Sequence, residues 1–271
     1  MFGHPVSHSL SPWIHARFAE LTGQVLGYEA RDVPPGDFAS ALVAFLAEGG
    51  RGLNVTLPHK LEAFSAAGRL TARAQRAGAV NTLVVMPTGL LGDNTDGAGL
   101  LRDLHSNLGV EIADRRVLLL GAGGAARGVL PALLDARPRE IVVANRTAWK
   151  AMALAKEFAA AGQVSGVDIK LAQGPFDLIL NATSASLAGE VPALPDTAVA
   201  PTTFCYDLAY GAEPTAFLHW ARERNAAGLA DGTGMLVEQA AESFELWRGL
   251  RPPTGPVLAE LRRRLVSTRC S

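Results

Sequence analysis

A glycine cluster in the middle of the chain could hold a phosphate group. The apolar residues 117–120 read as a buried strand, the cluster 121–124 follows at once, and residues 125–134 carry Ala, Val and Leu at helical spacing. Glycines at such a turn let a phosphate approach the amides of a helix N-terminus. Because strand, turn and helix come in this order, we favour a dinucleotide-binding turn over glycines that serve only a tight connection. The predicted cofactor residues here are Gly121, Ala122, Gly123, Gly124 and Ala125.

The residues after the next strand indicate which dinucleotide binds. An acidic residue there would accept hydrogen bonds from a ribose 2′-hydroxyl, whereas a cation favours a 2′-phosphate. The strand predicted at residues 140–144 runs into Asn145, Arg146 and Thr147, and Lys150 lies one helical turn further on. Arg146 can donate a forked, charge-assisted hydrogen bond to a phosphate, and Thr147 adds a hydroxyl. The pattern therefore favours NADP over NAD, with an ordinary exposed arginine as the alternative.

Polar residues gather in the first third of the chain, where they suit a small ligand that carries several hydroxyl groups. They stand in four short runs, at residues 7–11, 54–60, 81–82 and 94–96. Each run also has a plain structural interpretation, since Ser11 before Pro12 is typical of a helix start and Asp96-Gly97 of a turn. Their joint occurrence favours a binding site.

Two of these polar residues could move a proton. When hydride leaves a carbinol carbon for a nicotinamide, the hydroxyl proton must pass to a titratable group within hydrogen-bond reach. Lys60 and Asp96 are the candidates. The sequence leaves open whether Lys60 acts as a neutral base or as an ammonium that stabilises charge. His8 and His59 are less favoured proton carriers.

The elements that must position these groups fall into two blocks. Beyond residue 115 the pattern alternates apolar strands with amphipathic helices, which predicts a doubly wound, Rossmann-type α/β domain. The first block is predicted to be a separate, mixed α/β domain. In the second block the strands are expected at 117–120, 140–144, 176–180 and 204–208, and the helices at 125–134, 149–161 and 215–224. In the first block the strands are expected at 25–30, 52–55, 81–85 and 90–93, and a helix at 37–48.

The last long helix must return to the first block. Leu236, Ala240, Phe244 and Trp247 lie on one helical face, which needs a partner surface. We therefore expect a substrate-binding domain at residues 1–98, an NADP-binding domain at 99–233, and helices at 234–271 that pack back on the substrate domain. Glycine-rich crossings at 97–99 and 231–234 are expected to form a hinge or tight turns.

Composition limits the classes of partner. The 25 Lys and Arg residues nearly balance the 26 Asp and Glu residues, so no general attraction to nucleic acid or to an acidic membrane is expected. Cys205 and Cys270 stand alone, which predicts neither a disulfide nor a metal site. No segment resembles a signal peptide or a membrane span. We expect a cytoplasmic protein with a small-molecule substrate, and both a monomer and a homodimer are compatible with the sequence.

The chain resembles shikimate dehydrogenase over essentially its whole length. The family opens with a strand before the Gly-x-Pro segment, whereas only Met1 and Phe2 precede that segment here, and this departure calls the first strand into question. The matching segments, in order along the chain, are residues 3–5, 8–12, 54–60, 79–82, 92–97, 121–126, 145–147, 181–184, 206–210 and 234–241.

The resemblance implies an NADP-dependent oxidoreductase that reversibly reduces 3-dehydroshikimate to shikimate, a step of aromatic amino-acid biosynthesis. It places the chemistry on Lys60 and Asp96, and it implies that Ser9, Ser11 and Tyr210 hold the substrate carboxylate. The residues implied around the ring hydroxyls are Thr56, Asn81, Asp96 and Gln239, and Asn54 is a further predicted substrate-binding residue. The further cofactor contacts implied are Thr183, Ser184, Leu208, Gly232 and Met235.

Two alternatives remain open. A paralogue that acts on quinate or an aminated shikimate would share the fold and most of the pocket, although Arg146 argues against a change to NAD. A non-catalytic sensor of shikimate or NADP would use the same scaffold. The presence of both Lys60 and Asp96 disfavours the sensor, because a sensor needs no proton carrier.

Overall fold

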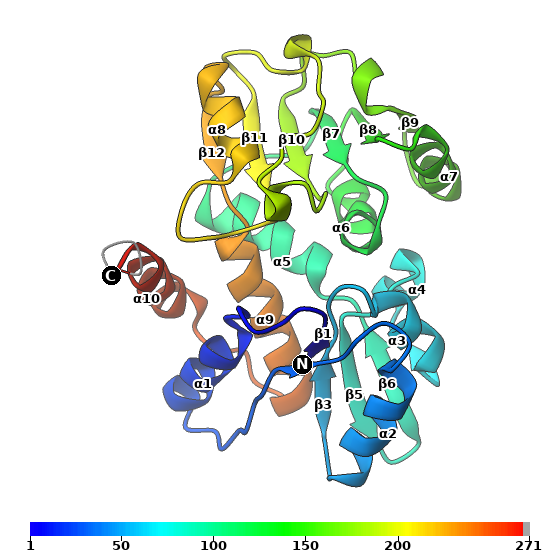
Figure 1. Ribbon diagram of the computed structural model, residues 1–271, viewed down its shortest axis with the longest axis vertical. Coiled ribbons are helices and arrows are strands. Elements are labelled where there is room, and N and C mark those ends of the chain that lie inside the picture. The colour runs from blue at the N-terminus through cyan, green and yellow to red at the C-terminus, as the bar shows by residue number, and fades with distance from the viewer. Residues whose placement is uncertain (268–271) are drawn as a thin grey trace.

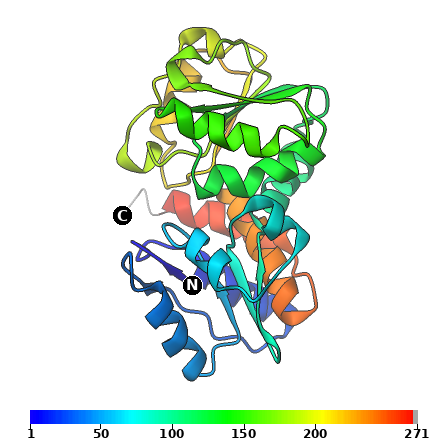
Figure 2. The ribbon, with the colours of Figure 1, turned by 90° about the vertical axis from the view of Figure 1, so that its right-hand side faces the viewer.

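The computed structural model describes residues 1–267, so Cys270 lies outside the described residues. The six-stranded and four-stranded sheets occupy opposite ends of the molecule (Figure 1). Helix α5 (Asp96–Arg102) and the start of α9 (Thr233–Arg248) lie between them, and the rest of α9 runs alongside the smaller sheet. The view turned by 90° shows the same separation (Figure 2). Within the described residues, no helix is both long and apolar enough to cross a membrane.

The larger sheet confirms the doubly wound domain. Its six strands are all parallel, in the order β12-β11-β10-β7-β8-β9. The apolar run in β7 is buried on both faces, because Val117 and Leu119 pack with α6 and α7 while Leu118 and Leu120 pack with α8. The strands are β7 (Arg116–Leu120), β8 (Glu140–Asn145), β9 (Val164–Asp168), β10 (Leu178–Asn181), β11 (Phe204–Asp207) and β12 (Gly228–Ala230). The helices are α6 (Gly124–Asp135), α7 (Ala148–Phe158) and α8 (Ala216–Glu223), with short 3₁₀ helices η2 (Ile169–Leu171), η3 (Ser186–Ala188) and η4 (Asp196–Ala198).

The smaller sheet has mixed strand directions, as expected for the first block. Its order is β3-β5-β6-β4, where β5 runs antiparallel to β3 and β6 while β4 pairs in parallel with β6. A two-stranded parallel sheet of β1 and β2 lies beside it, so a first strand is present. The strands are β1 (Phe2–Gly3), β2 (Arg31–Asp32), β3 (Gly52–Asn54), β4 (Arg69–Leu70), β5 (Thr82–Met86) and β6 (Gly89–Asp93). The helices are α2 (Phe38–Ala47), α3 (Lys60–Ala66) and α4 (Ala72–Ala77).

Two local expectations were wrong. Residues 25–30 form no strand, because exposed and half-buried residues alternate there without a neighbouring strand to pair with, and only β2 makes a ladder. The glycines at 97–99 form no tight turn, because they lie inside α5. In that helix Gly97 packs closely on Ala132 of α6, and Gly99 on Gln239 of α9.

The last long helix packs back on the first block, as predicted. Ala240 and Phe244 are fully buried against α1 (Ser11–Thr22) and α10 (Thr254–Ser267). The Trp247 indole N–H donates to the carbonyl of Leu83 in β5 at 3.0 Å. A π-helical segment, η1 (Asp103–Asn107), continues α5 toward the larger sheet.

Candidate functional site

The predicted phosphate turn lies at the carboxyl end of β7. Gly121 has φ of +101°, a left-handed conformation that strains any residue with a side chain. The first backbone bond of α6 runs from the Arg127 amide to the Gly123 carbonyl, so the amides of the preceding turn have no acceptor within the helix. Gly123 is exposed and has open space beside its Cα. Such a turn fits a dinucleotide phosphate.

The residues predicted for the 2′-phosphate follow β8. The Asn145 amide donates to the Thr147 carbonyl at 3.1 Å, which fixes the chain at the start of α7. Arg146 and Lys150 are exposed, and neither pairs with a carboxylate in the part of the chain that the structure describes. The Lys150 ammonium lies 5.7 Å from the centre of the Trp149 ring. Two free cations at this strand end suit a phosphate group.

The remaining predicted cofactor residues lie at the carboxyl ends of neighbouring strands. Thr183 follows β10, where its amide and hydroxyl both donate to the Asn181 amide oxygen, at 3.1 and 2.7 Å. Leu208 follows β11, and Gly232 packs against its carbonyl. Ser184 is exposed beside Thr183, and Met235 is buried in the first turn of α9. All these strand ends face the same edge of the parallel sheet.

Lys60 and Asp96 meet in the smaller half of the molecule. Lys60 begins α3 and Asp96 begins α5, and the Lys60 ammonium forms an ion pair with Asp96 Oδ2. The Asn81 amide donates to Asp96 Oδ1 at 2.8 Å and to the Thr95 hydroxyl at 2.8 Å. The Asp96 side chain is only 7% exposed and that of Lys60 12%, so water screens this pair little.

A buried polar layer supports this pair from behind. The Asn54 amide donates to the hydroxyls of Thr82 and Ser243, at 3.0 and 2.9 Å, and the Tyr28 hydroxyl donates to Asn54 Oδ1 at 2.8 Å. Asn54 also donates to the Asn81 carbonyl at 3.3 Å. The layer therefore fixes Asn81, and through Asn81 it fixes Asp96.

The residues implied for a carboxylate lie around the start of α1. The Ser11 amide donates to the Ser9 hydroxyl at 3.3 Å. Tyr210 reaches across from the larger half, where its hydroxyl interacts with the backbone of Leu10. Burial raises the pKa of Tyr210, although the interaction with Leu10 opposes this shift. Tyr210 therefore stays a neutral hydroxyl donor at neutral pH.

Thr56 and Gln239 lie on different sides of the substrate residues. Thr56 is half-buried after β3, and its methyl group packs on Gly3. Gln239 comes from α9, and its Oε1 lies 3.4 Å from both the Asn81 amide nitrogen and the Thr95 hydroxyl. The returning helix thus brings Gln239 to the polar layer, as the resemblance implied.

A second buried cluster anchors the start of α9 to the larger sheet. The Tyr206 hydroxyl in β11 donates to Asp103 Oδ2 at 2.7 Å, and the Asn107 amide donates to Oδ1 at 2.9 Å. The Asp103 carboxylate also packs directly on Gly234. Burial raises the pKa of Asp103, although these two hydrogen bonds oppose the shift. The cluster sets the position of α9, which carries Met235 and Gln239.

The two halves meet where the phosphate turn reaches Lys60. A methyl group placed on Gly124 would lie 3.7 Å from Cβ and Cδ of Lys60. The first turn of α6 therefore faces the stem of the lysine side chain, with room for about one methyl group between them. This proximity brings the predicted cofactor residues close to the predicted proton carrier.

The two histidines weighed as proton carriers differ in burial. His59 is fully buried, where Nε2 lies 2.7 Å from the Val33 carbonyl and Nδ1 contacts Glu62. His8 is exposed. Among the described residues, no group of three His, Cys, Asp or Glu side chains is arranged to hold a metal ion.

Sequence reasoning did not assign roles to several members of the polar layer. Tyr28 lies in a segment expected to be a strand, which hid its contact with Asn54. Ser243 follows Gln239 by four residues on α9, so the helical period could have found it. Thr95 was noted only as part of the run 94–96, although it accepts a hydrogen bond from Asn81.

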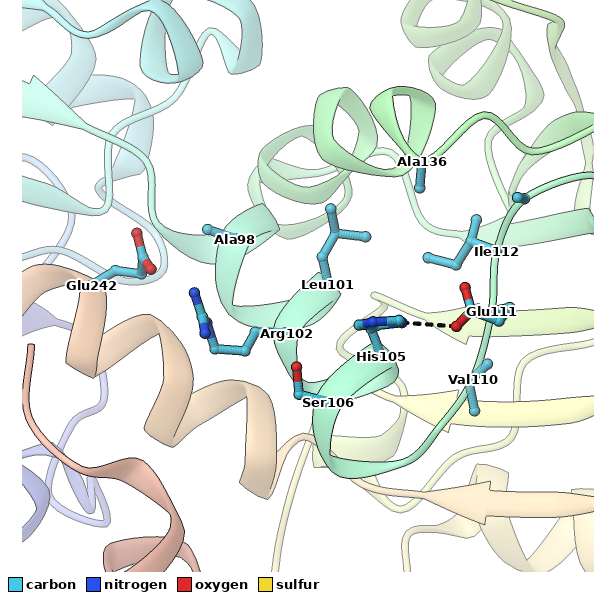
Figure 3. Close-up of a pocket in the computed structure, with 11 residues that line it drawn as sticks. Ala98, Leu101, Arg102, His105, Ser106, Val110, Glu111, Ile112, Ala136 and Glu242 are labelled. Atoms are coloured by element: carbon cyan, nitrogen blue, oxygen red, sulfur yellow. Dashed lines mark ion pairs between the residues drawn. The ribbon is translucent and has the colours of Figure 1, made fainter.

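A pocket of about 510 Å³ lies on the other face of α5 (Figure 3). Ala98, Leu101, Arg102 and His105 line it, and His105 pairs with Glu111 at 2.9 Å. These residues are about half a helical turn away from Asp96 and Leu100. The pocket is therefore separate from the Lys60–Asp96 pair.

Family models match three parts of the chain. The substrate binding domain of shikimate dehydrogenase matches residues 1–83, shikimate / quinate 5-dehydrogenase matches residues 103–191, and the C-terminal domain of shikimate 5′-dehydrogenase matches residues 232–262. Together these matches include most of the predicted site residues.

Individual proteins are similar over nearly the full length. Shikimate dehydrogenase (NADP(+)) from Alkalilimnicola ehrlichii is 55% identical over 97% of both chains, and that from Methylococcus capsulatus is 56% identical over 96% of this chain and 94% of its own. The structure of shikimate 5-dehydrogenase from Thermus thermophilus, in complex with NADP(H) and shikimate, is 36% identical, covers 98% of both chains and has a TM-score of 0.86. The chain belongs to the shikimate dehydrogenase family.

Proposed function

We propose that this chain catalyses the reversible, NADPH-dependent reduction of 3-dehydroshikimate to shikimate. The observation that carries the proposal is the buried Lys60–Asp96 ion pair, which lies against the first turn of α6. A proton carrier close to a dinucleotide turn is what a carbinol dehydrogenation needs. Relatives at 55% and 56% identity bear the name of this NADP-dependent enzyme, which supports the assignment.

The substrate ring lies, in this proposal, over the polar layer of the smaller half. Asn81, Asp96 and Gln239 are mutually hydrogen-bonded or adjacent, so they present a fixed set of donors and acceptors to the ring hydroxyls. Asn54 and Thr56 flank them. The Ser9, Ser11 and Tyr210 hydroxyls lie around the start of α1 and donate hydrogen bonds to the substrate carboxylate.

Lys60 and Asp96 handle the proton at the carbinol oxygen. Lys60 holds the oxygen with its Nζ and donates or accepts the proton, according to the direction of the reaction. Asp96 accepts hydrogen bonds from Lys60 and Asn81, so it orients the lysine, and its negative charge stabilises the ammonium form of Lys60. The surrounding burial keeps competing water away from Nζ.

NADP is held, in this proposal, by the turn and by the free cations after β8. Gly121 to Ala125 bind the pyrophosphate, Asn145, Arg146, Thr147 and Lys150 bind the 2′-phosphate end, and Thr183, Ser184, Leu208, Gly232 and Met235 line the nicotinamide end. When bound, the nicotinamide supplies or accepts the hydride. The open side of Gly123 and the unpaired Arg146 support this fit.

Two other functions use the same residues. A quinate or aminoshikimate dehydrogenase would keep the polar layer, and one matching family model is shared with quinate 5-dehydrogenase. A sensor would bind shikimate or NADP without turnover. The exposed cations after β8 favour an NADP enzyme, and the buried ion pair favours catalysis.

A steady-state assay with shikimate and NADP⁺ tests the proposal. We expect turnover, with lower kcat/KM when quinate replaces shikimate and when NAD⁺ replaces NADP⁺. Binding of shikimate without NADPH production would instead indicate a sensor. A higher kcat/KM with quinate would indicate the paralogue.

The wider context is proposed on the same basis. We place the substrate domain at residues 1–98, the NADP domain at 99–233 and the returning helices at 234–271. Since Cys205 is buried and unpaired, a reducing cytoplasm is the compartment we propose. A monomer or a homodimer is proposed, and sedimentation of the purified chain decides between them.

A further inference from the structure

Helix α6 continues the cofactor turn and also lies close to the Lys60–Asp96 ion pair. Gly128 lies one helical turn after Gly124, and a Cβ atom placed on Gly128 would lie 2.7 Å from Asp96 Oδ2. The same Cβ would lie 3.2 and 3.3 Å from the amide atoms of Asn94. A contact of 2.7 Å is closer than packed carbon and oxygen atoms tolerate, so any side chain at 128 must displace a neighbour.

The Asp96 carboxylate cannot move easily, because hydrogen bonds hold it on several sides. Its Oδ2 is paired with Lys60, and its Oδ1 accepts from Asn81 at 2.8 Å. The Asp96 amide donates to Asn94 Oδ1 at 3.1 Å, and the Asn94 amide nitrogen donates to the Ala79 carbonyl at 3.0 Å. All four bonds would have to adjust together.

Helix α6 is also held against the smaller half further along its length. Ala132 packs on Gly97, and Asp135 accepts two hydrogen bonds from Arg76 of α4, each at 2.8 Å. Arg76 additionally donates to the Pro131 carbonyl at 3.3 Å. A methyl group at 128 is therefore not accommodated by a simple tilt of the helix.

We infer that Gly128 is a positioning residue, which sets the location of the Asp96 carboxylate and hence of Lys60 relative to the cofactor turn. The inference rests on the proposed roles of Lys60 and Asp96. Helix α6 then positions two groups at once. Its first turn faces the proposed site of the cofactor phosphates, and its second turn faces the Asp96 carboxylate. A side chain at 128 would move the proton carrier away from the carbinol oxygen while the amides of the turn stay in place.

The activity test compares Gly128→Ala with Gly255→Ala. Gly255 also lies in a helix, but a Cβ there meets open space, so Gly255→Ala is the matched control. We expect Gly128→Ala to lower kcat about 10-fold or more, because small misplacements of reacting groups are costly, and to leave KM for shikimate and NADP⁺ within several-fold. We also expect the pH profile of kcat to shift in Gly128→Ala only.

The second test needs no turnover and applies even where Gly128→Ala unfolds easily. Thermal unfolding is measured for the natural chain, Gly128→Ala, Asp96→Ala and the double variant. We expect Gly128→Ala to lower Tm clearly more in the presence of Asp96 than in the Asp96→Ala background, where only the Asn94 amide remains close to the added methyl group. An equal loss of Tm in both backgrounds would overturn the contact.

A parallel Lys60→Ala variant separates the proposed roles of Lys60 and Asp96 from the inferred role of Gly128. If Lys60→Ala keeps its turnover, the proposed roles of the pair are wrong. If Lys60→Ala loses turnover while Gly128→Ala behaves like Gly255→Ala, the roles stand and the positioning role of Gly128 is overturned. Calorimetric titration of Gly128→Ala with NADP⁺ should give a dissociation constant within several-fold of the natural chain, and a large loss would mean that the cofactor turn itself has moved.

Discussion

The proposed substrate side and the proposed cofactor side of this molecule differ in the groups that would hold their ligands. On the substrate side, side chains such as Asn54, Asn81 and Asp96 are buried and hydrogen-bonded to one another. On the cofactor side, backbone amides of a turn and two exposed cations, Arg146 and Lys150, carry the predicted recognition. The groups of the substrate side are already hydrogen-bonded to one another, whereas the amides and cations of the cofactor side gain their partners when the ligand binds.

This difference predicts how each side responds to change. A buried network holds groups where a reaction needs them, so its loss should appear in kcat. An exposed cation gains most when an anion arrives, so its loss should appear in KM for that anion. The following experiments can break or sharpen this contrast.

The largest effect is expected at Lys60. We expect Lys60→Ala to lower kcat by roughly 10²-fold or more, the scale of a positioned general acid or base, and to leave substrate affinity within several-fold. Lys150→Ala, which removes an exposed lysine on the cofactor side, is the matched control and should change mainly KM for NADP⁺. Stopped-flow and steady-state rates of the folded variants check this, and near-natural turnover in Lys60→Ala would remove Lys60 from the mechanism.

A smaller and more selective effect is expected at Arg146. We expect Arg146→Ala to raise KM for NADP⁺ much more than KM for NAD⁺, because only NADP⁺ carries the 2′-phosphate. A charge-assisted forked contact contributes about 1.5–3 kcal/mol. Arg139→Ala is the control, since Arg139 is also exposed but lies just before the first residue of β8, at the end of the strand away from Arg146. Equal losses with both cofactors would show that Arg146 does not discriminate between them.

The contrast also explains what could be predicted from the sequence. The doubly wound half was predictable because its central strands are apolar on both faces and its turn is marked by glycines. Strands β9 and β12 were missed because they are only partly buried and contain Gly166 and Gly228. Strand β12 is also only 3 residues long. In the first half, the contact between Tyr28 and Asn54 joins segments whose pairing no local pattern encodes.

The residue types of the candidate site could be proposed from the sequence, but the contacts between them could not. Lys60 and Asp96 stand 36 positions apart, and their ion pair depends on how α3 and α5 leave the smaller sheet. The sequence places Gly128 only within the helix expected at 125–134, whereas a Cβ added to it would meet the Asp96 carboxylate. Helical period alone does not reveal a contact between two helices from different halves, because the partner helix sets it.

The smallest effect concerns the stability of the substrate side. His15 in α1 is fully buried and stacks on the Tyr28 ring, with 4.2 Å between the ring centres. Among residues 1–267, neither of its ring nitrogens has a hydrogen-bond partner. Burial lowers the pKa of His15 to about 3, from an ordinary value of 6.5. Between these two pH values the unfolded chain binds a proton that the folded chain does not, so stability is lost as pH falls below 6.5.

Replacing His15 should therefore flatten the pH dependence of folding. From pH 7.5 to pH 5.5, linkage predicts that the natural chain loses about 1.4 kcal/mol more free energy of unfolding than His15→Phe, which keeps a ring but cannot titrate. Urea unfolding at the two pH values measures this difference, and His219→Phe on the exposed side of α8 is the control. An equal pH dependence in the natural chain and His15→Phe would mean that water reaches the imidazole. The polar layer around Tyr28 and Asn54 would then be open to solvent, and the contrast between a buried substrate side and an exposed cofactor side would fail.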